Sequence, residues 1–301
     1  SSVEPDGIYV FPPVNPDTAF YEQRTDRNIG WISPNEQKIL KDSKVAIAGL
    51  GGMGGPLAPT LLRMGIGTMK LADLEDFDVT NINRQYGATR FNIGKSKAFE
   101  TVRALRAITD DTTLMVYPRG INQQDVDDFV DGCDVVLDMV EFWAVSARIM
   151  LHKAARKKGI TVITANPVGM GTRFFIFDDK ACSIEEFIGV TQEEADIFEQ
   201  KAGLATKKDK LLMIASVMTN FVPELPFYAP ETAIASSHNA LRKRILDDGK
   251  PSVLGCNLPM ASGFLANHTV LYLLRNSDVA RSKLPEYPCA PGYIYFDSAF
   301  V

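Results

Sequence analysis

The sequence is poor in the features that build metal sites, disulfide frameworks and membrane spans. Its 301 residues include four cysteines, without a C-x-x-C pair, and three histidines that lack the spacing of metal ligands. A structural zinc site therefore has no visible ligands, and a disulfide framework is not expected in a chain of this length. No apolar run reaches about 18 residues, so the pattern contains no membrane-spanning helix. The first residues do not read as a signal peptide, and we expect a cytoplasmic protein.

The chain also lacks a basic charge excess. Its formal net charge is −5, which disfavours nucleic-acid binding because that function usually needs a basic face. A modified tRNA base remains a candidate partner despite this charge. Hydrophobic residues make up 46% and charged residues 23%, and these proportions are typical of an ordinary globular protein.

Short apolar runs alternate with helical periodicity between residues 44 and 164. Strands are predicted at 44–48, 68–72, 114–117, 135–139 and 160–164, and helices at 56–64, 93–107, 125–130 and 144–158. This alternation predicts parallel βαβ units, and therefore an α/β fold with a Rossmann-like, doubly wound, mostly parallel sheet. Four more elements lie outside this region: a helix at 34–41 capped by Ser33, a strand at 172–177, a helix at 261–275 and an edge strand at 293–296.

A glycine-rich turn follows the first of these strands. In "GLGGMGG" at 49–55, Gly49, Gly51, Gly52 and Gly54 follow the spacing G-x-G-G-x-G and precede a predicted helix. Such glycines let phosphate oxygens approach backbone N–H groups, and the helix N-terminus adds partial positive charge. Asp73 ends the next strand, where an acidic residue accepts a ribose hydroxyl. The arrangement predicts nucleotide binding; the alternative is a tight turn whose glycines serve packing alone.

The charged stretch after the second strand bears on which nucleotide is bound. It reads "DLEDFDVTNINRQ" at 73–85 and is followed by "GKSK" at 94–97. Arg84 and Lys97 would neutralise β- and γ-phosphate oxygens, Asn81 would bond to one of them, and carboxylates would hold Mg²⁺. An NAD-dependent oxidoreductase explains the glycines and the acid, but gives the two cations no role.

The motifs "GLGGMGG", "LADLED", "TNINRQ" and "GKSK" occur in an order and spacing that resemble the ThiF/MoeB/HesA family of ubiquitin-activating-like adenylating enzymes. The resemblance covers about residues 24–177. Because the zinc cysteines of many relatives are missing, the chain looks like a divergent bacterial branch. "TNINRQ" also looks like the branch that includes the tRNA threonylcarbamoyladenosine dehydratase.

The resemblance implies roles for individual residues. Asp73 would bind the ribose, and Glu75 would lie near the ribose or the metal. The triphosphate would be surrounded by four side chains, namely Asn81, Arg84, Gln85 and Lys97. The element "RTDR" at 24–27 resembles the arginine-finger element of the family. Arg27 would act there on the γ-phosphate, often from the other subunit of a homodimer; the alternative is an ordinary surface arginine.

The segment "DMVE" at 138–141 departs from the family pattern. The family usually has D-x-x-D, whose second Asp binds Mg²⁺; Glu141 stands in that position, and Phe142 replaces a common asparagine. Glu141 would bind Mg²⁺ with altered geometry. This departure supports the alternative of a nucleotide-binding but catalytically weak scaffold or regulatory subunit. Cys182 is a candidate nucleophile by its position after the last core strand, although nearby glutamates would raise its pKa.

The resemblance implies an ATP-dependent adenylyltransferase, which joins AMP to a carboxylate and releases pyrophosphate. The substrate would be the C-terminus of a small ubiquitin-like or sulfur-carrier protein, a peptide or another carboxylate. ATP and Mg²⁺ are the expected cofactors, without zinc, and a homodimer is expected. We expect residues 1–42 to form an N-terminal arm and helix, and 43–178 the nucleotide-binding adenylation domain. Residues 179–301 would add a crossover or cap, a C-terminal helix and a tail to the same domain.

Overall fold

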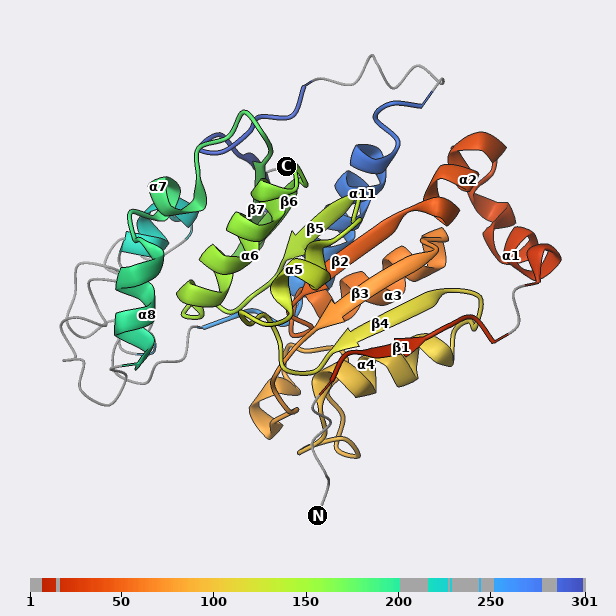
Figure 1. Ribbon diagram of the computed structural model, residues 1–301, viewed down its shortest axis with the longest axis horizontal. Helices are drawn as coiled ribbons and strands as arrows, with labels where there is room; N and C mark the ends of the chain where they lie inside the picture. The colour runs from red at the N-terminus through yellow and green to blue at the C-terminus, as the bar shows by residue number, and fades with distance from the viewer. Residues whose placement is uncertain are drawn as a thin grey trace.

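An eight-stranded sheet forms the centre of the protein (Figure 1). The computed structural model describes residues 7–14, 17–200, 216–226, 228, 244, 252–277 and 286–299. The strand order is β1-β4-β3-β2-β5-β6-β7-β8. The strands are β1 (Tyr9–Phe11), β2 (Lys44–Ala48), β3 (Thr68–Ala72), β4 (Thr113–Tyr117), β5 (Val135–Asp138), β6 (Val162–Val168), β7 (Gly171–Phe177) and β8 (Ile294–Asp297).

The five central strands, from β4 to β6, are parallel, whereas β1, β7 and β8 pair antiparallel with their neighbours. The predicted doubly wound, mostly parallel α/β sheet is therefore confirmed. The strands predicted at 44–48 and 68–72 coincide with β2 and β3. Both strands are buried at four of their five positions, which explains their continuous apolar character.

Helices cover both faces of the sheet (Figure 1). The helices are α1 (Thr18–Thr25), η1 (Asp26–Asn28), α2 (Pro34–Asp42), α3 (Gly54–Met64), η2 (Val79–Asn81), α4 (Lys97–Arg106), α5 (Val126–Val130), α6 (Val145–Lys157), α7 (Ile184–Ile188), α8 (Gln192–Gln200) and α11 (Asn257–Leu273). One core cluster joins the sheet to α3, α4 and α11. A second core cluster joins the opposite face to α5, α6 and α7.

Local sequence signals fix several helix ends. Ser33 caps α2 through a capping box with Glu36, as the predicted helix at 34–41 requires. Gly65 ends α3 with φ +100°, a conformation that strongly favours glycine. The terminal signals of these helices therefore lie in the sequence itself.

The strand order reverses at β2, because β3 and β4 continue on one side and β5 and β6 on the other. Open α/β sheets bind ligands in the crevice beyond the carboxyl ends of the strands at such a switch point. In the observed register, Ala48 pairs with both Ala72 and Asp138. The residues that follow β2, β3 and β5 therefore leave the sheet at the same level.

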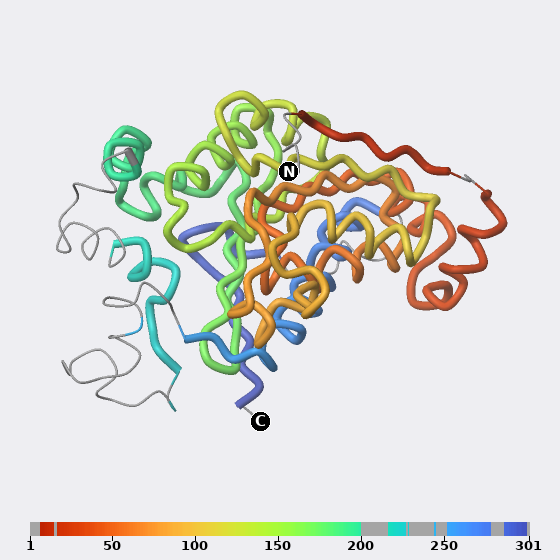
Figure 2. Tube along the Cα trace, turned by 90° about the horizontal axis from the view of Figure 1, so that it is seen from below, coloured from red at the N-terminus to blue at the C-terminus, as the bar shows by residue number. Residues whose placement is uncertain are grey.

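Two elements differ from the prediction. The arm expected to be extended contributes β1, which pairs antiparallel with β4 and closes one edge of the sheet; Figure 2 shows it along that edge. The helix expected at 93–107 begins at Lys97. Gly94, with φ +77°, and an antiparallel bridge between Asp76 and Ser96 hold the preceding residues outside the helix.

The segment after residue 179 was expected to be an irregular insertion or a helical cap, and its first part forms the helices α7 and α8. The lysine-rich sequence "KKDK" at 207–210 lies outside the described residues. The predicted edge strand at 293–296 is present as β8, which pairs with β7. Within the described residues, no helix combines the length and apolar character that a membrane crossing needs.

Candidate functional site

The glycine turn is compressed against its neighbours. Gly49 has φ +95°, and a Cβ added there would overlap the carbonyl oxygen of Met139 in the loop after β5. A Cβ at Gly54 would overlap the carbonyl oxygen of Gly49. These two glycines are therefore required to bring the start of α3 onto the turn and the turn onto β5. Packing alone explains them, so they do not by themselves distinguish a phosphate cradle from a structural turn.

The two middle glycines face the loop after β3 and the start of α11. A Cβ at Gly51 would approach Nε2 of Gln85 to 3.2 Å, and one at Gly52 would overlap the side chain of Leu258. Gln85 is buried, and its Oε1 has no hydrogen-bond partner among the described residues. A buried acceptor without a donor, beside a glycine turn, fits a ligand that brings its own hydroxyl or amino group.

Asp73 connects the glycine turn to the end of β3. Its Oδ2 accepts the N–H of Leu50 at 2.7 Å, and its Oδ1 accepts the N–H of Glu75 at 2.9 Å. Burial raises the pKa of Asp73, although Lys97 and the two N–H groups oppose the shift. The carboxylate is thus held beside the turn, at the position predicted for a ribose contact.

Lys97 begins α4 and forms an ion pair at the rim of the site. Its side chain is 2% exposed, and Nζ lies 2.5 Å from Oε2 of Glu75, whose side chain is 48% exposed. The backbone supports the same pairing, because the N–H of Lys97 donates to the carbonyl of Glu75. The ammonium group of Lys97 is therefore buried at the site, and the carboxylate of Glu75 already balances its charge.

The "TNINRQ" segment forms η2 and the turns after it. Asn81 uses Oδ1 to accept the N–H of Asp78, so this oxygen belongs to the η2 capping box. Arg84 donates from Nη1 to the carbonyl of Thr80 at 2.8 Å and to Oδ1 of Asn83 at 3.2 Å. These bonds fold the half-buried guanidinium back over its own loop.

Glu141 brings a third carboxylate to the same place. Burial raises its pKa first, and the charge of Glu75 raises it further, while Lys97 and Arg84 oppose the shift. Asp73 adds to the rise. These five predicted residues therefore interact electrostatically, although four of them follow β3 and the fifth follows β5. When all five are ionised, three negative charges face two positive ones, which is an environment that attracts a cation.

Asp138, at the first position of "DMVE", has a different surrounding. It is fully buried, and its Oδ2 accepts from Nε of Arg148 at 2.8 Å and contacts Nε2 of His152 at 3.0 Å. Burial opposes its ionisation, yet Arg148 and His152 lower the pKa of Asp138 to about 2. Nη2 of Arg148 also donates to the carbonyl of Val140, which fixes the loop that carries Glu141. Neither Arg148 nor His152 belongs to a recognised motif, so the sequence alone gives these two residues no role.

The described part of the chain contains no group of three or more His, Cys, Asp or Glu side chains arranged to hold a metal ion.

Cys182 is poorly suited to nucleophilic attack. Burial raises the pKa of its thiol, and the charge of Glu186 raises it further. A raised thiol pKa leaves less of the reactive thiolate at neutral pH.

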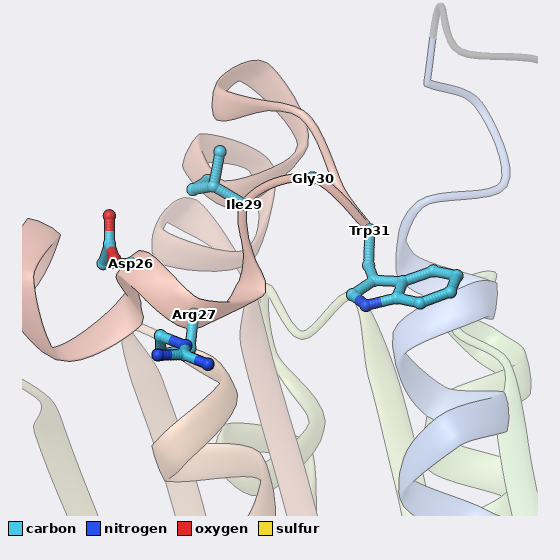
Figure 3. Close-up of a pocket in the computed structure, with 5 residues that line it drawn as sticks. All are labelled: Asp26, Arg27, Ile29, Gly30 and Trp31. Atoms are coloured by element: carbon cyan, nitrogen blue, oxygen red, sulfur yellow. The ribbon is translucent and has the colours of Figure 1, made fainter.

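Arg27 lies far from these groups within one chain. It belongs to η1, between α1 and α2, and this region meets the amino ends of the strands, whereas the turns after β3 lie at the opposite end of the sheet (Figure 1). Arg27 is exposed and lines an open hollow with Asp26, Ile29, Gly30 and Trp31 (Figure 3). Arg24 has a structural contact, since its Nε lies 2.6 Å from Asp111.

Sequence comparisons find relatives that match between about half and most of the chain. Over 145 residues, or 48% of the chain, it is 33% identical to the sulfur carrier protein ThiS adenylyltransferase of Escherichia coli. Over 150 residues, or 50% of the chain, it is 29% identical to the tRNA threonylcarbamoyladenosine dehydratase of Haemophilus influenzae. The match spans 57% of each of these two relatives. A third match, to the Bacillus subtilis dehydratase, is 25% identical and covers 85% of this chain and 97% of the relative.

Solved structures show the same fold. The E. coli tRNA N6-threonylcarbamoyladenosine dehydratase TcdA superposes with a TM-score of 0.59 at 16% identity, covering 88% of this chain and 98% of that one. E. coli MccB, solved with the peptide variant MccA-N7isoASN, gives a TM-score of 0.57 at 18% identity, covering 86% of this chain and 66% of that one. The sequence profile of the ThiF family matches residues 25–284. The chain therefore belongs to the ThiF family.

Proposed function

We propose that the protein adenylates a carboxylate with ATP. A carboxylate oxygen would attack the α-phosphorus, the bond from that phosphorus to the bridging oxygen would break, and pyrophosphate would leave. The observation that carries the proposal is the convergence of the glycine turn, Asp73, Glu141, Arg84 and Lys97 at the switch point of the sheet. The adenylyltransferase named among the relatives supports the same reaction.

The residues of the site divide the work. Asp73 would accept a ribose hydroxyl, while backbone N–H groups of the turn and the start of α3 would contact phosphate oxygens. Arg84 and Lys97 would stabilise the charge that develops on the departing pyrophosphate. Lys97 would keep its ion pair with Glu75 and offer its remaining N–H groups to the nucleotide. Positioning and charge neutralisation, rather than covalent catalysis, would supply most of the acceleration.

The residues present also fit Mg²⁺. Protein Mg²⁺ sites commonly use one or two carboxylates together with substrate phosphates, so a cage of three side chains is not required. Glu141 has a raised pKa next to other carboxylates, and a divalent cation would relieve that repulsion. When bound, the ion would offset the negative charge of the phosphates. Glu141 would hold it, and Arg148 would keep the Glu141 loop in place through Val140.

Arg27 would act from a second copy of the chain. Its element η1, between α1 and α2, lies at the opposite end of the sheet from the start of α4 and the loop after β5, so the site of the same chain is out of reach (Figure 1). Trp31, which is 90% exposed beside it, provides an apolar surface for docking that second copy. A homodimer would then contain two sites, each completed by the partner.

The acyl substrate is proposed to be the C-terminus of a small sulfur-carrier or ubiquitin-like protein, or of a peptide. Two named relatives support this class, since one acts on the sulfur carrier ThiS and MccB was solved with a peptide variant. A modified tRNA base, as in the dehydratases, is the competing substrate.

ATP–pyrophosphate exchange tests the reaction. Exchange should require Mg²⁺ and a carboxylate substrate, and should fall at least about 100-fold in Arg84→Ala and in Lys97→Ala. Arg63→Ala and Lys153→Ala are matched controls, because both side chains are exposed on helices away from the site. Tight NADH binding without ATP binding would contradict the proposal in favour of an oxidoreductase.

A nucleotide-binding scaffold is the second candidate. It is favoured by the existing ion pair between Lys97 and Glu75, which already neutralises one of the two cations of the site. ATP binding without exchange, across carrier proteins, peptides and small acids, would support this candidate.

Mixing two inactive variants tests the role of Arg27. If Arg27 acts on the partner's site, mixed dimers of Arg27→Ala and Arg84→Ala contain one intact site. The mixture should recover about a quarter of the wild-type exchange, because half of the dimers are mixed and half of their sites are intact. No recovery beyond that of the separate variants would argue against a shared site.

A further inference from the structure

Two buried side chains with unused hydrogen-bond donors lie opposite each other on the antiparallel strands β6 and β7. Asn166 in β6 and Arg173 in β7 are directly paired in register, and they are 6% and 2% exposed. Residues paired in this way share one face, with Cβ atoms about 5 Å apart. Nδ2 of Asn166 and both Nε and Nη1 of Arg173 are buried and have no hydrogen-bond partner in the described structure.

The existing contacts of Arg173 balance its charge but leave these donors unused. Nη2 donates to the carbonyl of Glu224 at 2.7 Å, and the guanidinium lies 4.3 Å from the ring centre of Tyr295. Asp297 is close enough to interact electrostatically, yet its oxygens accept from Tyr228, Tyr295 and the N–H of Ala299. The fold therefore supplies a counter-charge without supplying an acceptor for Nε and Nη1 of Arg173.

Buried polar groups are nearly always hydrogen-bonded, because an unmet donor loses its bonds to water without replacement. Here three such atoms come from neighbouring side chains on the same face, and all three are donors. One of the side chains is a cation. This combination matches an oxyanion better than a neutral carbonyl, since charge-assisted hydrogen bonds are the stronger class.

These donors lie next to the proposed adenylation site. Asp138, at the end of β5, pairs with Thr164 of β6. Asn166 follows two residues later on the same face, about 7 Å further along the strand. Asn166 and Arg173 therefore lie beyond the end of β5, on the side of the sheet where the Glu141 loop begins.

One segment covers both places. In residues 216–226, Phe221 packs at 6.2 Å from Phe142 and at 5.5 Å from Phe175, measured between ring centres. The carbonyl of Glu224 in the same segment accepts from Arg173. Because the unused donors are buried, a ligand reaches them when this segment moves away from β7.

We infer that Asn166 and Arg173 bind a second carboxylate of the acyl substrate, apart from the carboxylate that is adenylated. The inference rests on the proposed function and narrows its substrate to acids with two carboxylates, including a peptide whose C-terminal region carries an acidic side chain. Binding the second carboxylate beneath residues 216–226 would direct the first one toward the Glu141 loop.

Equilibrium binding of succinate, without nucleotide, tests this subsite, with succinamide as the neutral analogue of the same length. The wild-type protein should bind succinate saturably and at least tenfold more tightly than succinamide. Arg173→Gln and Asn166→Asp should each weaken succinate binding at least tenfold. Asn166→Asp is nearly isosteric and places a carboxylate of the protein opposite Arg173, where it competes with the ligand. Asn220→Asp is the matched control, because it adds the same charge at an exposed position of the covering segment.

Stability provides a second measurement. Asn166→Asp should melt no lower than Asn220→Asp, because the new carboxylate accepts from the unused donors of Arg173. A lower Tm, or succinate binding that is absent in wild type or unchanged in both subsite variants, overturns the inference. Arg63→Ala, an exposed change on α3, should bind succinate as wild type does. Succinate binding that depends on Arg173 in a protein that fails to bind ATP would refute the proposed function and leave the subsite standing.

Discussion

Asp138 and Glu141 lie three residues apart at the end of β5, and their pKa values move in opposite directions. Asp138 is fully buried and Glu141 partly buried, and burial alone would raise the pKa of both. Arg148 and His152 contact Asp138 directly, and its pKa falls to about 2. Glu141 has Glu75 and Asp73 nearby, and its pKa rises.

The difference is between a carboxylate whose charge is fully paired and one whose charge is opposed by neighbouring carboxylates. Asp138 is held by complete pairing, and its partner Arg148 in turn fixes the backbone at Val140. Glu141 is held in position by that backbone, while its own charge is opposed by its surroundings. The fold thus stabilises the loop through one carboxylate and presents the other at higher free energy, a division common at binding sites.

Asp138→Asn should give the largest effect. Removing the carboxylate leaves the guanidinium of Arg148 buried without its counter-charge, and breaking a buried pair typically costs about 3–5 kcal/mol. Urea unfolding measures the loss, with Asp179→Asn, an exposed change of the same kind, as control. A loss below about 1 kcal/mol would show that the cluster does not hold the loop.

Glu141→Gln should affect exchange more than stability. We expect ATP–pyrophosphate exchange to fall at least about 100-fold, since a carboxylate that faces the phosphates is replaced by a neutral amide. The free energy of unfolding at pH 7 should stay equal or rise, because repulsion from Glu75 and Asp73 is removed. Glu193→Gln, on the exposed side of α8, is the control. A large stability loss would place Glu141 with Asp138 as a structural residue.

His152→Gln should have an intermediate effect on stability. The imidazole contacts Asp138 through Nε2 and packs edge-on against Phe177 at 4.7 Å between ring centres. Burial lowers the pKa of His152 despite the hydrogen bond to Asp138, so the ring is neutral near pH 7. Losing a neutral contact and an aromatic edge should cost about 1–2 kcal/mol by urea unfolding. A cost as large as that of Asp138→Asn would mean that the ring is charged in the fold.

The pH dependence of stability should show the smallest effect. The folded pKa of Glu141 is raised, so its contribution is fully present below the unfolded pKa of about 4.3 and is lost as pH rises through the folded value. Relative to Glu141→Gln, wild type should therefore lose stability as pH rises above about 4. Asp138 should act in the opposite sense, because its lowered pKa contributes stability above about pH 4 that is lost as pH falls toward 2. Parallel curves for wild type and Glu141→Gln would remove the contrast.

Local patterns predicted much of the parallel half of the fold. The boundaries of β2 and β3, the cap at Ser33 and the glycine turn before α3 follow from short-range signals. The spacing from the turn to Asp73 spans a helix and a strand of ordinary length. Register then brings Asp73 beside the turn, where it accepts the N–H of Leu50.

Long-range pairing explains what the patterns missed. β1 joins β4 more than 100 residues later. Its residues favour strands, but the run is only three residues long and two prolines follow it. The start of α4 was misjudged because the bridge between Asp76 and Ser96 holds the preceding residues away from the helix. Neither interaction leaves a periodic trace in the sequence.

The sequence by itself determined the fold class, the family and the set of charged residues near the glycine turn, because each depends on residue type and spacing along the chain. Tertiary structure alone decided that the charge of Asp138 is paired while that of Glu141 is not. It also decided that Arg27 lies away from the candidate site of the same chain, and that Asn166 lies opposite Arg173. These outcomes depend on which groups share a buried volume, and burial sets the energy of a charge only after the strands have paired.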